Sequence, residues 1–204
     1  MKLWYTTTSP FARKAVATMK YHQLESQVEM LRATAAFDAD SPHNKDNPLG
    51  RVPALQMRNG EWLFGSFWVA EYLDAQGAKP TLFPTNIRRW DVLALHALAD
   101  GILENTTTFL PERMFRPQQE WWISRHQQLM DRNTRSFRQL EDELDKWGDE
   151  LNIGTLAAVC LIDWWAFRSD KIGYNLAADF PKLAAYAEMM NRKYAVLAET
   201  KPAA

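Results

Sequence analysis

Two serine side chains lie where helices are expected to begin, and both could stabilise an anion. Ser9 precedes Pro10, and serine is a favoured N-cap while proline is favoured at the first helical position. A hydroxyl at the positive end of a helix can donate a hydrogen bond to an anion such as a thiolate. Ser66 follows Gly65 at the predicted start of a second helix, whose free N–H groups favour a carboxylate. Taken alone, Ser9 is better explained as a plain helix cap, while Ser66 can cap a helix and bind an anion together.

Other reactive side chains point to no site. Cys160 is the only cysteine, and it lies on an apolar helical stretch that predicts a core residue. The four histidines show no metal-ligand spacing with one another or with Cys160, so we expect no metal. A glycine-rich phosphate loop is absent from the sequence.

The first part of the chain mixes strands and helices. The predicted strands are Lys2–Thr6, Gln27–Leu31, Val52–Met57 and Glu61–Phe64, and the predicted helices run from Ser9 to about His22 and over Phe67–Gln76 with Ser66 as cap. The first two strands are joined through one helix, which indicates a parallel βαβ pair. Asn59-Gly60 predicts a type I′ hairpin turn between the last two strands. The residues therefore predict β-α-β, an irregular polar stretch over 33–50, and then β-β-α.

After a proline-containing linker over 77–86, the pattern is helical throughout. The predicted helices are Arg88–Phe109, Gln118–Trp147, a helix from Asn152 through Cys160 to Phe167, and Lys182–Lys193. The third helix carries the clearest start, because Leu151 and Leu156 flank the Asn152 cap as a hydrophobic staple. Thr155 occupies the position where a capping box would prefer an acid.

Composition excludes several classes of protein. The 204 residues are 47% hydrophobic and 24% charged, as in ordinary globular proteins. A net charge of −1 gives no general reason to expect nucleic acid or an anionic membrane as a partner. The chain lacks a run of about 18 apolar residues and an apolar leader, and a single cysteine fits a reducing compartment. We therefore expect a soluble, cytoplasmic protein.

The order and spacing of several motifs resemble those of glutathione S-transferases, most closely the bacterial and plant-type members that use serine. The motifs are Ser9 to Lys14, Asn47 to Leu55, Ser66 before Glu71-Tyr72-Leu73, Arg89-Trp90-Asp91, Ala99 to Ile102, and the stapled helix after Leu151. The resemblance implies an N-terminal thioredoxin-like α/β domain (β-α-β-α-β-β-α) over residues 1–78, which binds glutathione. It also implies an all-helical C-terminal domain over residues 86–204, which forms the pocket for an electrophile.

The resemblance also implies a catalytic role for Ser9, whose hydroxyl would stabilise the thiolate of glutathione. Thr8 is the alternative hydroxyl. Phe11 is predicted to bind glutathione and is a candidate pocket-lining residue. The thiolate is needed because a thiol is a poor nucleophile and titrates near ~8.5 when unperturbed.

Three further positions are implied to bind glutathione. Pro53 would be cis, so that the exposed Val52 backbone can pair with the cysteinyl unit of the tripeptide, whereas the alternative is an ordinary trans proline at a strand start. Arg51 would meet the glycine carboxylate, although a solvated surface arginine explains it nearly as well. Ser66 would bind the γ-glutamyl carboxylate at a helix N-terminus.

Gly65 departs from the family pattern, which usually has an acid or amide before this serine. Glycine offers no acceptor for the ammonium group of glutathione, so we expect weaker binding. Asp100 on the first long helix could supply an acid across a dimer interface.

These features lead to three functional hypotheses. The first is a homodimeric glutathione transferase in which the thiolate attacks a small apolar electrophile, with no metal or tightly bound organic cofactor. The second is a non-catalytic, transferase-like binding or regulatory protein, which Gly65 favours. The third is reduction of glutathione disulfides, which would have to use the sulfur of glutathione because no cysteine lies near Ser9.

Overall fold

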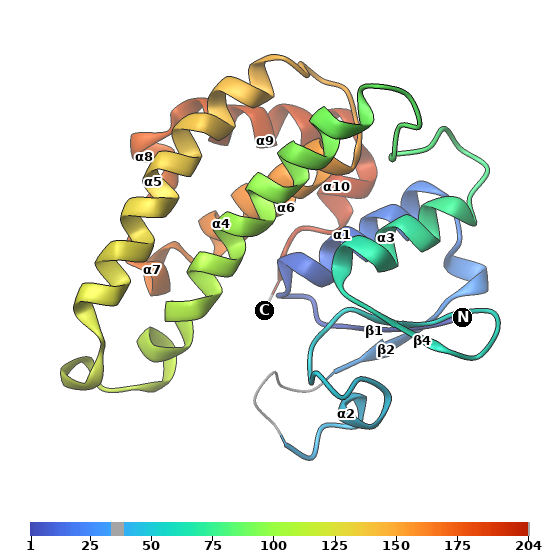
Figure 1. Cartoon of the computed structure of the whole chain (residues 1–204), viewed down its shortest axis with the longest axis horizontal. Coiled ribbons are helices and arrows are strands. Elements are labelled where there is room, and N and C mark those ends of the chain that lie inside the picture. The colour runs from blue at the N-terminus through green and yellow to red at the C-terminus, as the bar shows by residue number, and fades with distance from the viewer. Residues whose placement is uncertain (34–38, 204) are drawn as a thin grey trace. The chain divides into compact units, whose positions relative to one another are not determined.

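The computed structural model describes residues 1–33 and 39–203. The chain forms two compact units, one made of Met1–Phe83 with Ala195–Ala204 and the other of Pro84–Tyr194 (Figure 1). The predicted division into 1–78 and 86–204 assigns the last residues to the helical part, whereas the structure groups them with the first unit.

A four-stranded mixed sheet forms the first unit's centre, in the order β2-β1-β3-β4. Strand β1 (Lys2–Tyr5) pairs in parallel with β2 (Glu29–Arg32) and antiparallel with β3 (Ala54–Gln56). Strand β4 (Trp62–Phe64) pairs antiparallel with β3. The predicted parallel βαβ pair is therefore present, and each strand is shorter than its predicted range.

Helices α1 (Pro10–Tyr21) and α3 (Ser66–Ala75) cover one face of this sheet. Side chains alternate between the faces of a strand, and Leu3 and Leu55 accordingly point toward these two helices. Their buried core is completed by Ala15, Met19, Leu24, Val28, Val69 and Leu73. The neighbouring residues Trp4 and Ala54 form a smaller cluster with Ala33.

Helix α2 (His43–Asp46) interrupts the stretch that the residues alone predicted to be irregular. This helix matches the β-α-β-α-β-β-α order implied by the resemblance. The part of the stretch at residues 34–38 lies outside the described residues.

Two local predictions in this unit are wrong. The β3–β4 hairpin is closed by a bond from the Gly60 amide to the Met57 carbonyl, and Gly60 has a φ of +90°. Asn59 does not have the positive φ that a type I′ turn requires, and its side chain instead accepts a bond from the Glu61 amide. Ser66 is the first residue of α3, so Gly65 takes the N-cap position assigned to it.

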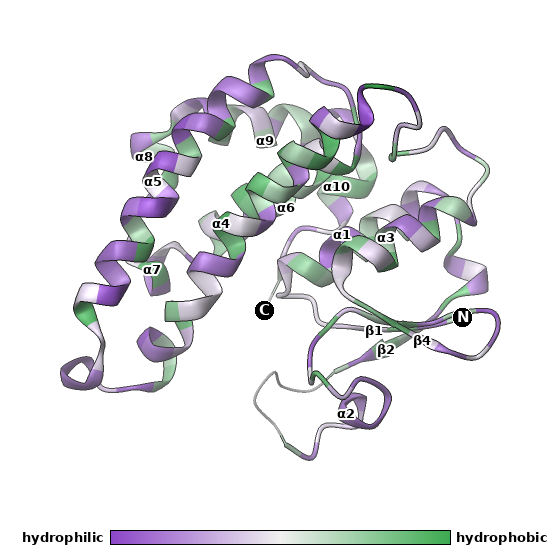
Figure 2. Cartoon of the chain, in the orientation of Figure 1, coloured by the Kyte–Doolittle hydropathy of each residue, from purple (hydrophilic) through white to green (hydrophobic). Residues whose placement is uncertain are grey.

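The second unit is helical, with α4 (Arg89–Phe115) packed against α5 (Ile123–Asp145) and α6 (Ile153–Phe167). The remaining α-helices of this unit are α7 (Ser169–Ile172), α8 (Leu176–Asp179) and α9 (Pro181–Lys193), and Gln118–Glu120 forms a short 3₁₀ turn. Helix α6 is the core helix, and its ribbon is largely green in Figure 2 because it is apolar on nearly every side. Gly154 lets it approach α4, since a Cβ there would lie 2.7 Å from the Val92 carbonyl oxygen.

The start of α6 carries a complete capping box. The Asn152 side chain accepts a bond from the Thr155 amide at 3.0 Å, and the Thr155 hydroxyl accepts one from the Asn152 amide at 2.9 Å. The predicted N-cap is confirmed, and Thr155 fulfils the role for which an acid was expected.

A buried His22–Asp74 pair fixes the end of the first unit. Asp74 Oδ1 lies 2.7 Å from His22 Nε2 and accepts a bond from the Leu82 amide at 2.8 Å. Its other oxygen accepts a bond from the Thr81 hydroxyl. Gly77 makes room for the histidine, because a Cβ at this position would lie 1.9 Å from His22 Nδ1. We call this group of three side chains and one backbone amide the His22–Asp74 clamp.

Helix α10 (Ala195–Glu199) completes the first unit by packing on α1. The buried Arg13 guanidinium donates to the Leu197 carbonyl at 2.8 Å, and the half-buried Lys20 pairs with Glu199 at 2.8 Å. None of the helices within the described residues is both long and apolar enough to cross a membrane.

Candidate functional site

The strand register brings three separate chain segments to one edge of the sheet. This edge is formed by the ends of neighbouring strands and is not an edge strand. Trp4 pairs with Ala54, and Ala54 pairs with Phe64. The exit of β1 toward Ser9, the entry to β3 after Val52-Pro53 and the exit of β4 toward Gly65-Ser66 therefore lie at the same edge. These are the segments that carry most of the predicted glutathione-binding residues.

Ser9 occupies the N-cap of α1, as predicted. Its φ of −87° and ψ of 121° are extended, and its Oγ accepts a bond from the Ala12 amide at 3.1 Å. This bond uses a lone pair of the hydroxyl and leaves its O–H able to donate elsewhere. Capping the helix and donating to an anion are therefore compatible roles for the same side chain. Thr8 directly precedes it and is half-buried.

Phe11 lies in the first turn of α1 with its ring half-buried. The buried Lys14 places its Nζ 5.5 Å from the Phe11 ring centroid, a cation–π distance. The pairing was not predicted, although the i,i+3 spacing of the two residues on a helix is a signal for it.

The Val52–Pro53 peptide bond is cis, which confirms the predicted isomer. Strand β3 begins only at Ala54, and the Val52 backbone makes no hydrogen bond to another backbone group of the described chain. Among the described residues, the Val52 N–H and C=O thus have no backbone partner at the edge where the three segments meet.

The loop before Val52 is built around Asn47, which is buried. Its Nδ2 donates to the Arg51 carbonyl at 2.7 Å, and its Oδ1 accepts a bond from the Leu49 amide at 3.0 Å. Gly50 has a φ of +61°, which allows the loop to close. The Arg51 side chain is exposed and makes no ion pair with another described residue. The positioning role of Asn47 was missed, although this residue opens the Asn47–Leu55 motif.

The N-terminus of α3 differs from that of α1 because no side chain caps it. Gly65 takes a φ of +85° and has no side chain to accept from the first amides, and the first turn contains no acid. Ser66 stands at the first helical position and is 8% exposed. A helix end of this kind has unsatisfied N–H groups and a partial positive charge.

Gly65 also has a conformational reason to be glycine. Its backbone lies in a region that side chains other than glycine rarely enter, and a Cβ would lie 3.2 Å from Trp68 Cδ1. An acid or amide at this position would have to adopt a strained backbone, whereas glycine adopts it without strain.

A second missed group secures α2 to the sheet. The Trp4 indole donates to Asp46 Oδ2 at 2.7 Å, and the buried His43 ring lies 6.2 Å from the Trp4 ring. His43 Nδ1 is 2.6 Å from the Ser41 hydroxyl. This network holds the segment that leads into the Asn47 loop.

Two other candidate residues lie in the second unit. Asp100 on α4 has its carboxylate 3.5 Å from His96 Nε2, and its predicted role across a dimer interface stays a prediction. Cys160 is fully buried in α6, as expected of a core residue. Within residues 1–33 and 39–203, no group of three or more histidine, cysteine or acidic side chains could hold a metal ion.

The first unit matches a known family model, described as the glutathione S-transferase N-terminal domain, over residues 8–76. YibF of Escherichia coli, an uncharacterised protein similar to glutathione S-transferases, is 29% identical over 198 residues, which cover 92% of each chain.

Solved structures agree over the whole chain. A glutathione transferase family member from Pseudomonas fluorescens, with bound glutathione, is 26% identical with a TM-score of 0.89, over 100% of this chain and 99% of that one. A glutathione S-transferase from Methylobacillus flagellatus, also with glutathione bound, is 26% identical with a TM-score of 0.87 over 99% of both chains. Residues 8–76 thus match the glutathione S-transferase N-terminal domain, and over its full length the chain has the glutathione S-transferase fold.

Proposed function

We propose that this protein is a glutathione transferase whose glutathione site is the sheet edge formed by Ser9, Val52-Pro53 and Ser66. The observation that carries the proposal is the unpaired Val52 backbone beside cis Pro53. A peptide ligand can pair with such an edge as a short strand. Two similar proteins of known structure hold glutathione, which is a tripeptide.

Each end of glutathione has a candidate partner at this edge. The uncapped N-terminus of α3 with Ser66 would receive the γ-glutamyl carboxylate, because its free N–H groups lack an internal acceptor. Arg51 would approach the glycine carboxylate from the Asn47 loop. The cysteinyl unit would pair with Val52, which leaves its sulfur to Ser9.

The chemistry follows from stabilising the thiolate. The Ser9 O–H would donate to the sulfur, while the hydroxyl oxygen keeps its bond from the Ala12 amide. The thiol proton passes to solvent, and the sulfur lone pair forms a bond to an electrophilic carbon. In a substitution the leaving group departs with its bonding electrons, and in an addition the electrons move onto the acceptor. Charge stabilisation and proximity are the contributions of the protein.

A second candidate function is a transferase-like binding or regulatory protein without catalysis. Gly65 favours it, because glycine supplies no acceptor for the ammonium group of glutathione. A binding protein tolerates a weakened glutathione site, whereas a transferase does not.

Calorimetric titration with reduced glutathione to millimolar concentration tests the proposal. We expect saturable binding at one site per chain, with lower affinity in Arg51→Gln and unchanged affinity in the matched control Arg88→Gln, which changes a cation of the second unit. Absence of binding by the folded protein would overturn the glutathione site. Binding without turnover of a panel of aryl halides and unsaturated carbonyl compounds would favour the second function.

Three further expectations stay predictions: a small apolar electrophile as second substrate, a homodimer, and a cytoplasmic location. Mass photometry or sedimentation tests the dimer directly. The identity of the electrophile requires the substrate panel described above.

A further inference from the structure

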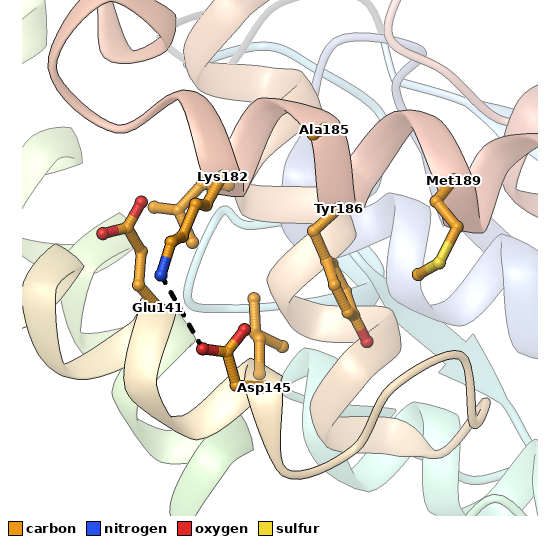
Figure 3. Close-up of a pocket in the computed structure, with 8 residues that line it drawn as sticks. Glu141, Asp145, Lys182, Ala185, Tyr186 and Met189 are labelled. Carbon is orange, nitrogen blue, oxygen red and sulfur yellow. Dashed lines mark ion pairs between the residues drawn. The ribbon is translucent and has the colours of Figure 1, made fainter.

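A pocket of about 380 Å³ lies between α5 and α9, entirely within the second unit (Figure 3). It is lined by Glu141, Leu144 and Asp145 of α5 and by Lys182, Leu183, Ala185, Tyr186 and Met189 of α9. It shares no residue with the proposed glutathione site. The volume falls within the range of pockets that hold small molecules, roughly 300–1,000 Å³.

Apolar groups form one part of the pocket. Leu144 and Leu183 are buried beneath it. Figure 3 shows the Tyr186 ring and the Met189 thioether extending from α9, beyond the charged residues. Burial raises the pKa of the Tyr186 phenol, which keeps the ring neutral across physiological pH. This part of the pocket suits an alkyl or aryl group.

Charged groups form the other end, and acids outnumber cations there. Glu141 and Asp145 are four residues apart on α5 and so share a face of the helix. Lys182 reaches Asp145 at 3.9 Å, and both side chains are largely exposed. Such a solvated pair contributes little, so Lys182 is easily displaced. The pocket residues carry one net negative charge.

One carboxylate oxygen at this end lacks a donor. Glu141 Oε1 is enclosed and has no hydrogen-bond partner in the part of the chain that the structure describes. A buried acceptor without a partner is unfavourable, and a charged donor offers the strongest compensation. The missing group is therefore a donor with positive charge.

We propose that the α5–α9 pocket binds small organic cations that carry an apolar body, such as alkyl or aryl primary amines. The Glu141 carboxylate turns about its last side-chain bond to present Oε1 to the pocket, where the ammonium group donates to it. The apolar body lies over Leu144 and Leu183 beside the Tyr186 ring. Binding needs no covalent step and does not depend on the proposed transferase activity.

Three probes of similar shape separate charge from apolar burial. Phenylbutylamine is the cation, phenylbutanol the neutral analogue and phenylbutyrate the anion. Calorimetry on the full chain is expected to show saturable amine binding at one site, with the alcohol weaker by about tenfold, the effect of one charged hydrogen bond. The anion is expected to bind more weakly still.

Two substitutions at the charged end should act in opposite directions. Glu141→Gln removes the charged acceptor and is expected to weaken the amine by about tenfold while leaving the alcohol unchanged. Lys182→Gln removes the competing cation and is expected to tighten the amine. Asp142→Asn is the matched control, because Asp142 is an exposed neighbour on α5 outside the pocket.

The position of the bound amine is determined by NMR of the methionine methyl groups. The Met189 signal is assigned by its loss in Met189→Leu. The amine is expected to shift the Met189 signal in the wild type. The proposal is overturned by equal affinity for amine and alcohol, by an unshifted Met189 signal, or by no saturable binding up to the solubility limit. It is also overturned if Glu141→Gln leaves amine affinity unchanged or if Lys182→Gln weakens it.

Discussion

At the scale of single residues, Ser9 has two roles that one substitution separates. Ser9→Ala removes the cap of α1 and is expected to lower the free energy of unfolding by about 1 kcal/mol. It also removes the proposed donor to the thiolate, which raises the pKa of the bound thiol. The pH–rate profile should therefore move to higher pH, with activity lost near neutrality and regained in alkali, while glutathione affinity stays nearly unchanged.

Thr8→Ala is the control for that experiment, because it removes the neighbouring hydroxyl and leaves the cap intact. Thiol titration by ultraviolet absorbance checks the pKa directly. If Ser9→Ala keeps full turnover and an unshifted titration, Ser9 has no part in the mechanism. A shift in Thr8→Ala alone would assign the role to Thr8.

Gly65 gives a second residue-scale prediction. Gly65→Ala forces a side chain into a φ of +85° beside Trp68, and is expected to cost about 1 to 3 kcal/mol of stability. Gly101→Ala is the opposite control, because Gly101 lies inside α4 with open space at its Cβ position. It should stabilise the protein by up to about 1 kcal/mol. Urea unfolding of both variants tests the pair, and destabilisation of equal size would contradict the conformational argument.

At the scale of elements, the His22–Asp74 clamp joins α1, α3 and the segment after α3. Asp74→Ala leaves His22 and the Leu82 amide without their buried acceptor, at an expected cost of about 2 to 3 kcal/mol. Glu61→Ala, an exposed acid in the hairpin, is the control and should change little. Hydrogen exchange is the measurement, with faster exchange expected at the Leu82 amide; unchanged protection there would show that the clamp does not hold the segment.

Elements with strong local signals could be predicted from the sequence. Ser9-Pro10 located the start of α1, and Asn152 located the start of α6, because both caps act within a few residues. The hairpin was predicted correctly, but the type I′ turn was wrong, because Asn59-Gly60 fits more than one turn type and the strand ends decide between them. The predicted N-cap of α3 was wrong by one residue. Gly65 takes this position instead of Ser66, because glycine can adopt the N-cap backbone without a side-chain bond.

The candidate site was predictable as a set of residues but not as a geometry. The cis Pro53 followed from the family resemblance, whereas the contacts of Asn47 and the Trp4–Asp46 bond join residues through tertiary structure. Neither contact leaves a periodic trace in the sequence. The α5–α9 pocket is of the same kind, because it depends on how two helices meet.

At the scale of the whole molecule, the first unit is made from two separated stretches of chain. Leu197 is fully buried in this unit, and its carbonyl accepts from the buried Arg13. Leu197→Ala is expected to lower stability by about 2 to 5 kcal/mol, the usual cost of such a core truncation. Hydrogen exchange should quicken in α1, while the control Val196→Ala, at a neighbouring half-buried position, should affect α1 much less. If the amides of α1 exchange at the same rate in Leu197→Ala and Val196→Ala, the burial of Leu197 does not stabilise α1.

The return of residues 195–204 to α1 also bears on the order in which the protein is made. During translation the sheet and its two covering helices are synthesised first, yet their last packing partner is synthesised after the entire helical unit. Domains generally fold as units as they emerge from the ribosome. Here the first unit to emerge lacks the α10 contact on α1 until the second unit has been synthesised.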